Sequence, residues 1–147
     1  MSTSILSRGI ARIPGLSVFV GGAVRFLHAW NAPAHISQIA GWGLRPSTGK
    51  ALAYARRHGL PYVALEDGFL RSFGTGEHFP PLSMVMDGAG IYYDSTRPSA
   101  LERLLASDAS LLEPDADAIR RARASVLDTG LSKYNHAPDL APGVLRA

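Results

Sequence analysis

The feature that most constrains the fold is a strand, helix, strand unit in residues 36–65. Residues 36–40 (ISQIA) alternate apolar and polar side chains, which is typical of a strand. Residues 47–58 predict a helix that begins with a serine cap and ends at Gly59, a residue suited to the left-handed conformation that closes helices. Residues 61–65 (PYVAL) predict a second, buried strand. A crossover of this size joins parallel strands, so we expect an α/β fold with a mainly parallel sheet.

Further elements follow this unit. Residues 82–86 predict a third strand, and residues 90–93 (GIYY) a short aromatic fourth strand. Ser99 and Glu102 have the spacing of a capping box, which predicts that a helix begins there. Residues 114–129 predict a last helix, with a proline in its first turn and a glycine after its end.

The two ends of the chain are less determined. Residues 1–30 fit either a helix followed by a turn or a short strand, and residues 41–43 (GWG) predict a glycine-flanked turn. Residues 131–147 predict an irregular tail, in which Val144 and Leu145 resemble the start of another strand. We therefore expect residues 1–147 to be part of a larger enzyme.

Composition excludes several classes of protein. The chain has 147 residues, which suits one domain, and no cysteine, which excludes disulfides and thiolate metal sites. Its net charge is +3, but its arginines are spread along the chain, so we expect no nucleic-acid partner. No apolar run approaches the roughly 20 residues of a membrane span. We expect a cytoplasmic protein.

The segment from Glu66 to Ser72 is the strongest candidate site. It follows the strand at residues 61–65, at the carboxyl end where parallel sheets bind their ligands. Phe69 offers an apolar or stacking face, Arg71 a planar donor fork and Ser72 a hydroxyl group. These groups, with the carboxylates of Glu66 and Asp67, predict binding of an anionic molecule rich in hydroxyl groups.

The two carboxylates have alternative interpretations. Either Glu66 or Asp67 could act as a general acid or base, but adjacent side chains of a strand point to opposite faces, so we expect one of them to do this work. Glu66 or Asp67 could instead cap the following turn while Arg71 forms a structural ion pair with one of them.

Weaker signals surround this segment. Residues 74–76 (GTG) could cradle a phosphate, but they lack the other residues of known phosphate-binding loops and also suit a surface turn. The five histidines lack the spacing of a helical metal pair, so we expect no metal site. Four residues could extend the site, although turn roles for the aspartates and core roles for the tyrosines are the commoner explanation: Asp87, Tyr92, Tyr93 and Asp94.

Six separate sequence motifs resemble those of one family, and they occur in that family's order and with approximately its spacing. They are GWGLRPS at 41–47, LEDGFLRS at 65–72, PLS at 81–83, GIYYD at 90–94, PSALE at 98–102 and SKYN at 132–135. The chain thereby resembles the capsular polysaccharide biosynthesis and export family of KpsC and LipA type over about residues 5–140.

This resemblance implies a retaining β-Kdo glycosyltransferase, which moves Kdo (3-deoxy-manno-octulosonic acid) from its cytidine monophosphate donor, CMP-Kdo, to a lipid-linked acceptor. Such enzymes have two Rossmann-like lobes in the arrangement called GT-B, and this chain resembles the first, acceptor-side lobe. The motifs that supply the family's nucleophile and bind its donor do not occur here, so the resemblance implies a lobe that is inactive alone. It also implies that this lobe holds no cofactor. A non-catalytic module that binds a sugar or a partner is the alternative.

The resemblance also implies where the site lies and what it meets. The implied acceptor-binding residues are Trp42, Glu66, Asp67, Phe69, Arg71 and Ser72. The implied partners are a sugar or glycolipid acceptor and either a second lobe or the capsule export machinery. A lipid-linked acceptor implies that the protein acts as a peripheral protein at the inner face of the inner membrane.

Overall fold

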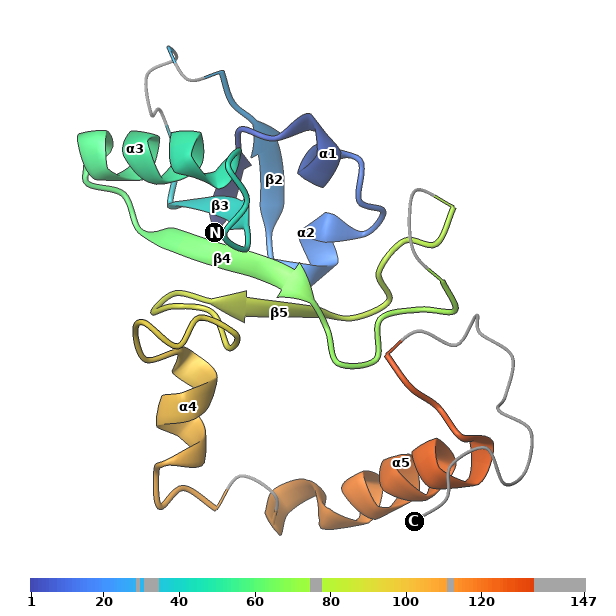
Figure 1. Cartoon of the computed structure of the whole chain (residues 1–147). Coiled ribbons are helices and arrows are strands. Elements are labelled where there is room, and N and C mark those ends of the chain that lie inside the picture. Colours follow the sequence, from blue (N-terminus) through green and yellow to red (C-terminus); the bar gives the residue numbers. More distant parts are fainter. Residues whose placement is uncertain (29, 31–34, 75–77, 111–112, 134–147) are drawn as a thin grey trace.

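A five-stranded sheet forms the centre of the protein, for which a computed structural model describes residues 1–28, 30, 35–74, 78–110 and 113–133 (Figure 1). The strand order is β2-β1-β3-β4-β5. The first four strands are parallel, and β5 runs antiparallel to β4. The strands are β1 Ser2–Ile5, β2 Ala23–Phe26, β3 Gln38–Trp42, β4 Tyr62–Asp67 and β5 Met84–Asp87. The predicted α/β fold with a mainly parallel sheet is confirmed.

The predicted crossover is β3, α3 (Thr48–His58) and β4. Gly59 ends α3 with a φ of 63°, as its position indicated. The predicted turn at residues 41–43 is wrong, since Gly41 and Trp42 are still paired with β4 and only Gly43 leaves the strand. The physical reason is that β3 is an inner strand with buried residues on both faces, so its apolar run continues beyond the alternating segment.

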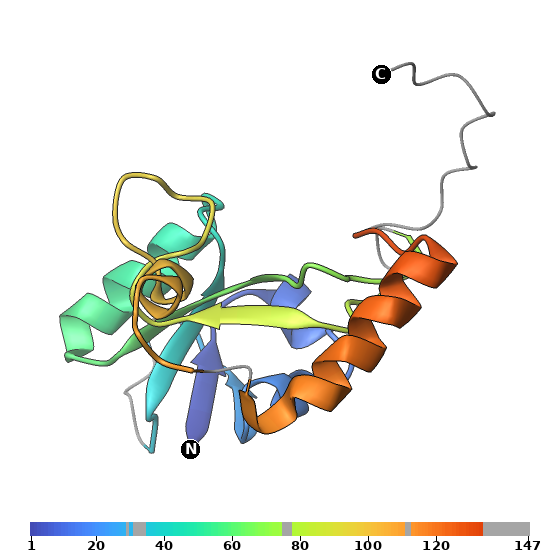
Figure 2. The ribbon, with the colours of Figure 1, turned by 90° about the horizontal axis from the view of Figure 1, so that it is seen from below.

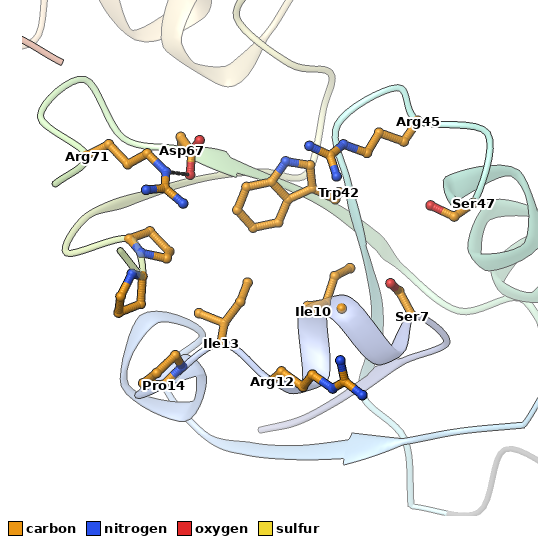
Figure 3. A pocket seen from close by; sticks show the side chains of 13 residues that line it. Ser7, Ile10, Arg12, Ile13, Pro14, Trp42, Arg45, Ser47, Asp67 and Arg71 are labelled. Carbon is orange, nitrogen blue, oxygen red and sulfur yellow. Dashed lines mark ion pairs between the residues drawn. The ribbon is translucent and has the colours of Figure 1, made fainter. Parts of the chain in front are cut away.

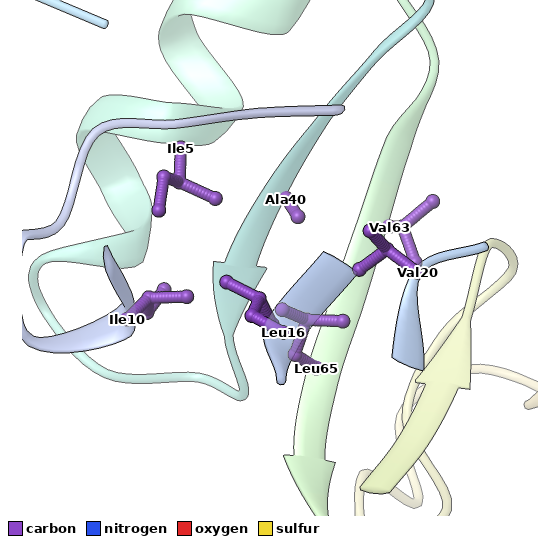
Figure 4. Packing of buried hydrophobic residues seen from close by; sticks show 7 residues of the cluster. All are labelled: Ile5, Ile10, Leu16, Val20, Ala40, Val63 and Leu65. Carbon is purple, nitrogen blue, oxygen red and sulfur yellow. The ribbon is translucent and has the colours of Figure 1, made fainter. Parts of the chain in front are cut away.

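Helices cover both faces of the sheet. Helices α1 (Arg8–Ala11) and α2 (Leu16–Phe19) lie on one face and α3 lies on the other, as Figure 2 shows. A buried cluster fills the space beneath α1 and α2 and contains Ile5, Ile10, Leu16, Val20, Ala40, Val63 and Leu65 (Figure 4). A second cluster beneath α3 contains Leu27, Ile39, Ala51, Tyr54 and Ala55. Three layers result.

The amino-terminal region, ambiguous in sequence, is a strand, two short helices and a second strand. Residues Ile10, Leu16 and Val20 are buried because they cover the sheet, although no regular period links them. β1 lies between β2 and β3, so the direction of chain progression along the sheet reverses between β1 and β3.

The predicted strand at residues 90–93 is wrong, because this segment forms turns after β5. The buried carboxylate of Asp87 accepts hydrogen bonds from the backbone N–H groups of Ala89 (2.7 Å) and Gly90 (2.8 Å), and Asp94 N–H donates to the Ile91 carbonyl (2.9 Å). These local bonds satisfy the backbone without a sheet partner.

The last two helices lie beyond β5 and bury no side chain (Figure 1). The capping box at Ser99 and Glu102 is present at the start of α4 (Ala100–Leu105). The predicted helix at 114–129 is a 3₁₀ turn at Glu113–Asp115 followed by α5 (Ala116–Thr129). The predicted strand start at residues 144–145, like most of the predicted tail, lies outside the described residues. No helix in the part of the chain that the structure describes is long and apolar enough to cross a membrane.

Candidate functional site

A cavity of about 560 Å³ opens at the carboxyl ends of β1, β3 and β4 (Figure 3). This is the point where the strand order reverses, which is where open α/β sheets bind their ligands. Its volume is in the range of small-molecule sites. Its lining comprises Ser7, Gly9, Ile10, Arg12, Ile13, Pro14, Trp42, Arg45, Ser47, Asp67, Arg71, Pro80 and Pro81.

The loop from β3 to α3 forms one wall of this cavity. The hydroxyl group of Thr48, in the first turn of α3, donates to the Trp42 carbonyl at 2.7 Å, and Thr48 N–H donates to the Arg45 carbonyl at 2.8 Å. Ser47 lies before the helix as predicted, but its side chain makes no capping bond and it lines the cavity instead. These bonds hold Trp42 and Arg45 on a fixed backbone.

Asp67 and Arg71 continue this wall on the other side of Trp42 (Figure 3). Asp67 ends β4, and its Oδ1 lies 2.8 Å from Arg71 Nε, as an ion pair drawn in Figure 3. Both side chains are largely buried, with exposed fractions of 16% and 11%. The structural ion pair considered from the sequence is therefore present, and it lies inside a cavity, where it can also contact a ligand.

Arg71 also organises the long loop between β4 and β5. Its Nη1 donates to the carbonyls of Gly74 (2.8 Å) and Phe79 (2.6 Å) and to the hydroxyl oxygen of Ser72 (2.8 Å). Ser72 in turn donates to the Gly74 carbonyl at 2.7 Å. Among the residues with described positions, Nη2 makes no hydrogen bond, so one edge of the guanidinium group has free donors.

Glu66 lies on the other face of the sheet. Its Oε2 accepts from the Tyr93 hydroxyl group at 3.1 Å, and the Tyr93 oxygen accepts from the backbone N–H of Leu44 at 3.1 Å. Gly43 has a φ of 46°, and a Cβ atom there would collide with the Tyr93 oxygen and Glu66 Oε2. Burial, followed by the Glu66 carboxylate, raises the pKa of Tyr93 although Leu44 N–H lowers it. Glu66 thus supports the loop that carries Arg45.

The structure brings three of the six predicted site residues together in the cavity: Trp42, Asp67 and Arg71. Ser72 lies behind Arg71, and Phe69 lies at the surface with its ring 5.1 Å from that of Tyr92. Asp87 has a turn role, because it binds the N–H groups after β5. Tyr93 adjoins Glu66, away from the cavity.

Sequence reasoning missed part of the lining. Ser7 and Arg12 come from the region whose elements were ambiguous, so no strand end pointed to them. Arg45 had a usable signal, since it follows β3 as Asp67 follows β4, and the same rule for strand ends applies to both. Within the ranges that the structure describes, no group of three acidic or histidine side chains is placed to hold a metal ion.

Three comparisons agree on the relatives of this chain. A profile described as capsule polysaccharide biosynthesis protein matches residues 37–138. The capsule polysaccharide modification protein LipA of Neisseria meningitidis serogroup A is 50% identical over 139 residues, which make up 93% of this chain and 19% of LipA. The lipopolysaccharide-processing protein LpsZ of Rhizobium meliloti is 43% identical over 103 residues, or 67% of this chain and 23% of LpsZ.

Solved structures give the same picture. The KpsC β Kdo 2,4 transferase of Thermosulfurimonas dismutans superposes with a TM-score of 0.83 at 41% identity, over 99% of this chain and 45% of the solved chain. The KpsC β Kdo 2,7 transferase of the same organism superposes with a TM-score of 0.52 at 26% identity. The chain spans about a fifth of the length of LipA and less than half of the solved transferases. Its profile match and its identity to LipA mean that the chain belongs to the capsule polysaccharide biosynthesis protein family.

Proposed function

We propose that this chain is the acceptor-side lobe of a β-Kdo transferase, which moves Kdo from CMP-Kdo to a lipid-linked acceptor when the capsule linker is built. Its similarity to the solved β Kdo 2,4 transferase supports this reaction, since the match covers almost the whole chain. Because the match covers only 45% of that transferase, we expect the chain to need a second lobe for turnover.

The observation that supports the proposal is that the cavity is lined by residues from several separate sequence motifs. Three separate sequence motifs supply part of its lining: residues 41–47 give Trp42, Arg45 and Ser47, residues 65–72 give Asp67 and Arg71, and residues 81–83 give Pro81. The cavity lies at the carboxyl edge of a parallel sheet, where a sugar could meet a second lobe. Segments with these different structural roles converge on one ligand-sized space.

The lining suggests a role for each candidate. Trp42 offers an aromatic face for a sugar ring, and Asp67 is positioned to orient or deprotonate an acceptor hydroxyl group. Arg71 holds Asp67 and can offer its Nη2 donors to a carboxylate or phosphate. Glu66 is the weaker acid or base, since it lies on the opposite face, and Ser72 contributes by fixing Arg71. Phe69 is exposed and does not line the cavity, so it is the weakest of the proposed acceptor contacts.

The place of work follows from the acceptor. A lipid-linked acceptor made with a cytoplasmic nucleotide sugar requires the lobe to act in the cytoplasm, peripherally at the inner face of the inner membrane. The partner in this setting is a second lobe or the capsule export machinery.

The test is a transfer assay with CMP-Kdo and a Kdo-primed glycolipid. The chain is assayed alone and mixed with a separately expressed second lobe taken from the Thermosulfurimonas dismutans transferase, and the product is detected as a mass increase of one Kdo. We expect no turnover by the chain alone and turnover by the mixture. The same mixture with the Asp67→Asn variant is the control for a contaminating transferase.

Two outcomes contradict parts of this proposal. Turnover by the chain alone would show that the lobe contains the whole catalytic machinery. A chain that binds a Kdo glycoside but yields no product with any second lobe would be the alternative, a sugar-binding module.

A further inference from the structure

The cavity carries more positive charge than its acidic residue can neutralise. Its lining includes three guanidinium groups, on Arg12, Arg45 and Arg71, and one carboxylate, on Asp67. Three positive charges and one negative charge leave an excess of two. Arg71 is paired with Asp67, whereas neither Arg12 nor Arg45 forms an ion pair within the described parts of the chain.

The two unpaired arginines lie on ordered backbone. Arg45 N–H donates to the Trp42 carbonyl at 3.4 Å, and the Arg45 carbonyl accepts from Thr48. Arg12 lies between residues bonded in the turn that closes α1, where Ile13 N–H donates to the Ile10 carbonyl at 3.1 Å. An ordered backbone fixes the point from which each exposed side chain extends, which limits the conformational freedom that is lost when its guanidinium group binds an anion.

The charges surround an apolar surface. In Figure 3, Arg45 and Arg71 lie on either side of Trp42, while Arg12 lies across the cavity beside Ile10 and Ile13. A simple inorganic anion would use the charges but not the indole ring. A saccharide with anionic groups at two places uses both, because its ring faces can contact Trp42 while its oxyanions meet separate guanidinium groups.

We propose that Arg12 and Arg45 form a second anion subsite, through which the cavity selects an acceptor with two anionic groups over one with a single anionic group. This inference rests on the proposed function and specifies its acceptor. The shared chemistry is two oxyanions on one saccharide head group, either two sugar carboxylates or one carboxylate and one phosphate. Guanidinium groups pair with both kinds of oxyanion.

The test measures binding to the 147-residue chain by calorimetry with four probes. They are a neutral disaccharide, a Kdo methyl glycoside, a Kdo disaccharide and a Kdo glycoside that carries a phosphate. We expect the two doubly anionic probes to bind about tenfold more tightly than the Kdo methyl glycoside at low salt, and the preference to shrink as salt is added. The probe with the stronger preference identifies the second anionic group.

Arg12→Gln and Arg45→Gln are the test variants, since both side chains are exposed and neither has a structural ion pair within the described residues. Each should reduce the tenfold preference for two anionic groups by roughly threefold, and the double variant should abolish it. Arg57→Gln is the matched control. It removes the same charge from an exposed position at the opposite end of α3 and should leave the preference unchanged. Equal thermal midpoints for all variants confirm that the fold is intact.

Three results would overturn the inference: a double variant that keeps the preference, a neutral disaccharide that binds as tightly as the anionic probes, or no binding of any probe at millimolar concentration. The transfer assay separates this failure from a failure of the proposed function. The mixture could turn over while the double variant keeps the same ratio of KM values for singly and doubly anionic acceptors. That result would refute the subsite alone. A subsite that behaves as expected, together with no product from the mixture of the chain and a second lobe, would refute the function alone.

Discussion

Glu66 and Asp67 are adjacent in β4 but lie on opposite faces of the sheet. Asp67 points to the α1 and α2 face, where it pairs with Arg71 inside the cavity. Glu66 points to the α3 face, where both of its oxygens accept hydrogen bonds from the protein, from Tyr93 and from the Asp67 backbone N–H. Two neighbouring carboxylates of one strand therefore have different environments.

The difference extends to the strand beside them. Asp87 of β5 lies on the same face as Glu66, and it accepts backbone hydrogen bonds from three residues. On this face, carboxylates hold loops in place. On the other face, Asp67 lines a cavity together with Arg12 and Arg45, which form no ion pair with any residue of described position. Alternation along a strand thus separates the supporting role from the ligand-facing role.

Substitution of Asp67 should have the largest effect, because Asp67 is the carboxylate on the cavity face of the sheet. Asp67→Asn in the assembled transferase should lower kcat roughly 10²- to 10⁴-fold, the usual contribution of a general base, with a smaller change in acceptor KM. Glu66→Gln keeps the size of the side chain and should lower kcat by less than about tenfold. Steady-state kinetics decide between them. A larger loss in the Glu66 variant would exchange the two roles.

Arg71 should show the next largest effect, on stability. Arg71→Met leaves Asp67 without its partner and removes the donor for the Ser72, Gly74 and Phe79 oxygens, so the free energy of unfolding should fall by about 3–5 kcal/mol. Urea unfolding measures it. Arg120→Met, in an exposed pair with Asp117, should change it by less than about 1 kcal/mol. A similar loss in both variants would contradict a structural role for the Asp67 pair.

The pH dependence of stability tests the structural role of Asp87, which lies on the same face of the sheet as Glu66. Burial alone would raise the pKa of Asp87, but hydrogen bonds from the N–H groups of Gly90, Ala89 and Ala100 outweigh it and hold the pKa below 3.8. The stabilisation is therefore complete above the unfolded pKa and is lost as the pH falls through the lower folded pKa. Asp87→Asn should cost about 1–3 kcal/mol at pH 7, because an amide N–H₂ would face a backbone donor. The difference from the unmodified chain should shrink below pH 3.8, which acid unfolding curves can check.

Tyr93 should give the smallest effect. Tyr93→Phe removes the hydroxyl group that joins Glu66 to the Leu44 backbone, and the free energy of unfolding should fall by about 1 kcal/mol. Because this bond holds the loop that carries Arg45, affinity for an anionic acceptor should fall severalfold while kcat changes little. An unchanged affinity would mean that the two faces are independent.

The sequence was most informative where local chemistry and tertiary structure agree. The crossover from β3 to β4 was predictable from its periodicity and from Gly59, and the capping box of α4 from the spacing of Ser99 and Glu102. The opposite directions of Glu66 and Asp67 followed from the period of a strand. The strand assigned to residues 90–93 failed because hydrogen bonds to Asp87 make turns there, and a count of aromatic residues does not reveal such bonds.

The site was only partly predictable for a related reason. Asp67 and Arg71 lie in one short segment after a recognisable strand. Ser7 and Arg12 follow β1, whose four residues gave no clear alternation, and they reach the cavity only because β1 lies next to β3 in the sheet. The order of strands is a tertiary property, so the arginines that surround Trp42 were visible as a group only in the structure.

The indole N–H of Trp42 provides the most direct test that the cavity, and not the Glu66 face, holds the acceptor. The chain has two tryptophans, so the two indole signals in a proton–nitrogen NMR spectrum can be assigned with a Trp30→Phe variant. On titration with a Kdo disaccharide, we predict a saturable shift of the Trp42 indole signal and smaller shifts at Glu66 and Tyr93, and no such response to CMP. A titration that moves the Tyr93 and Glu66 signals while Trp42 stays constant would contradict this assignment.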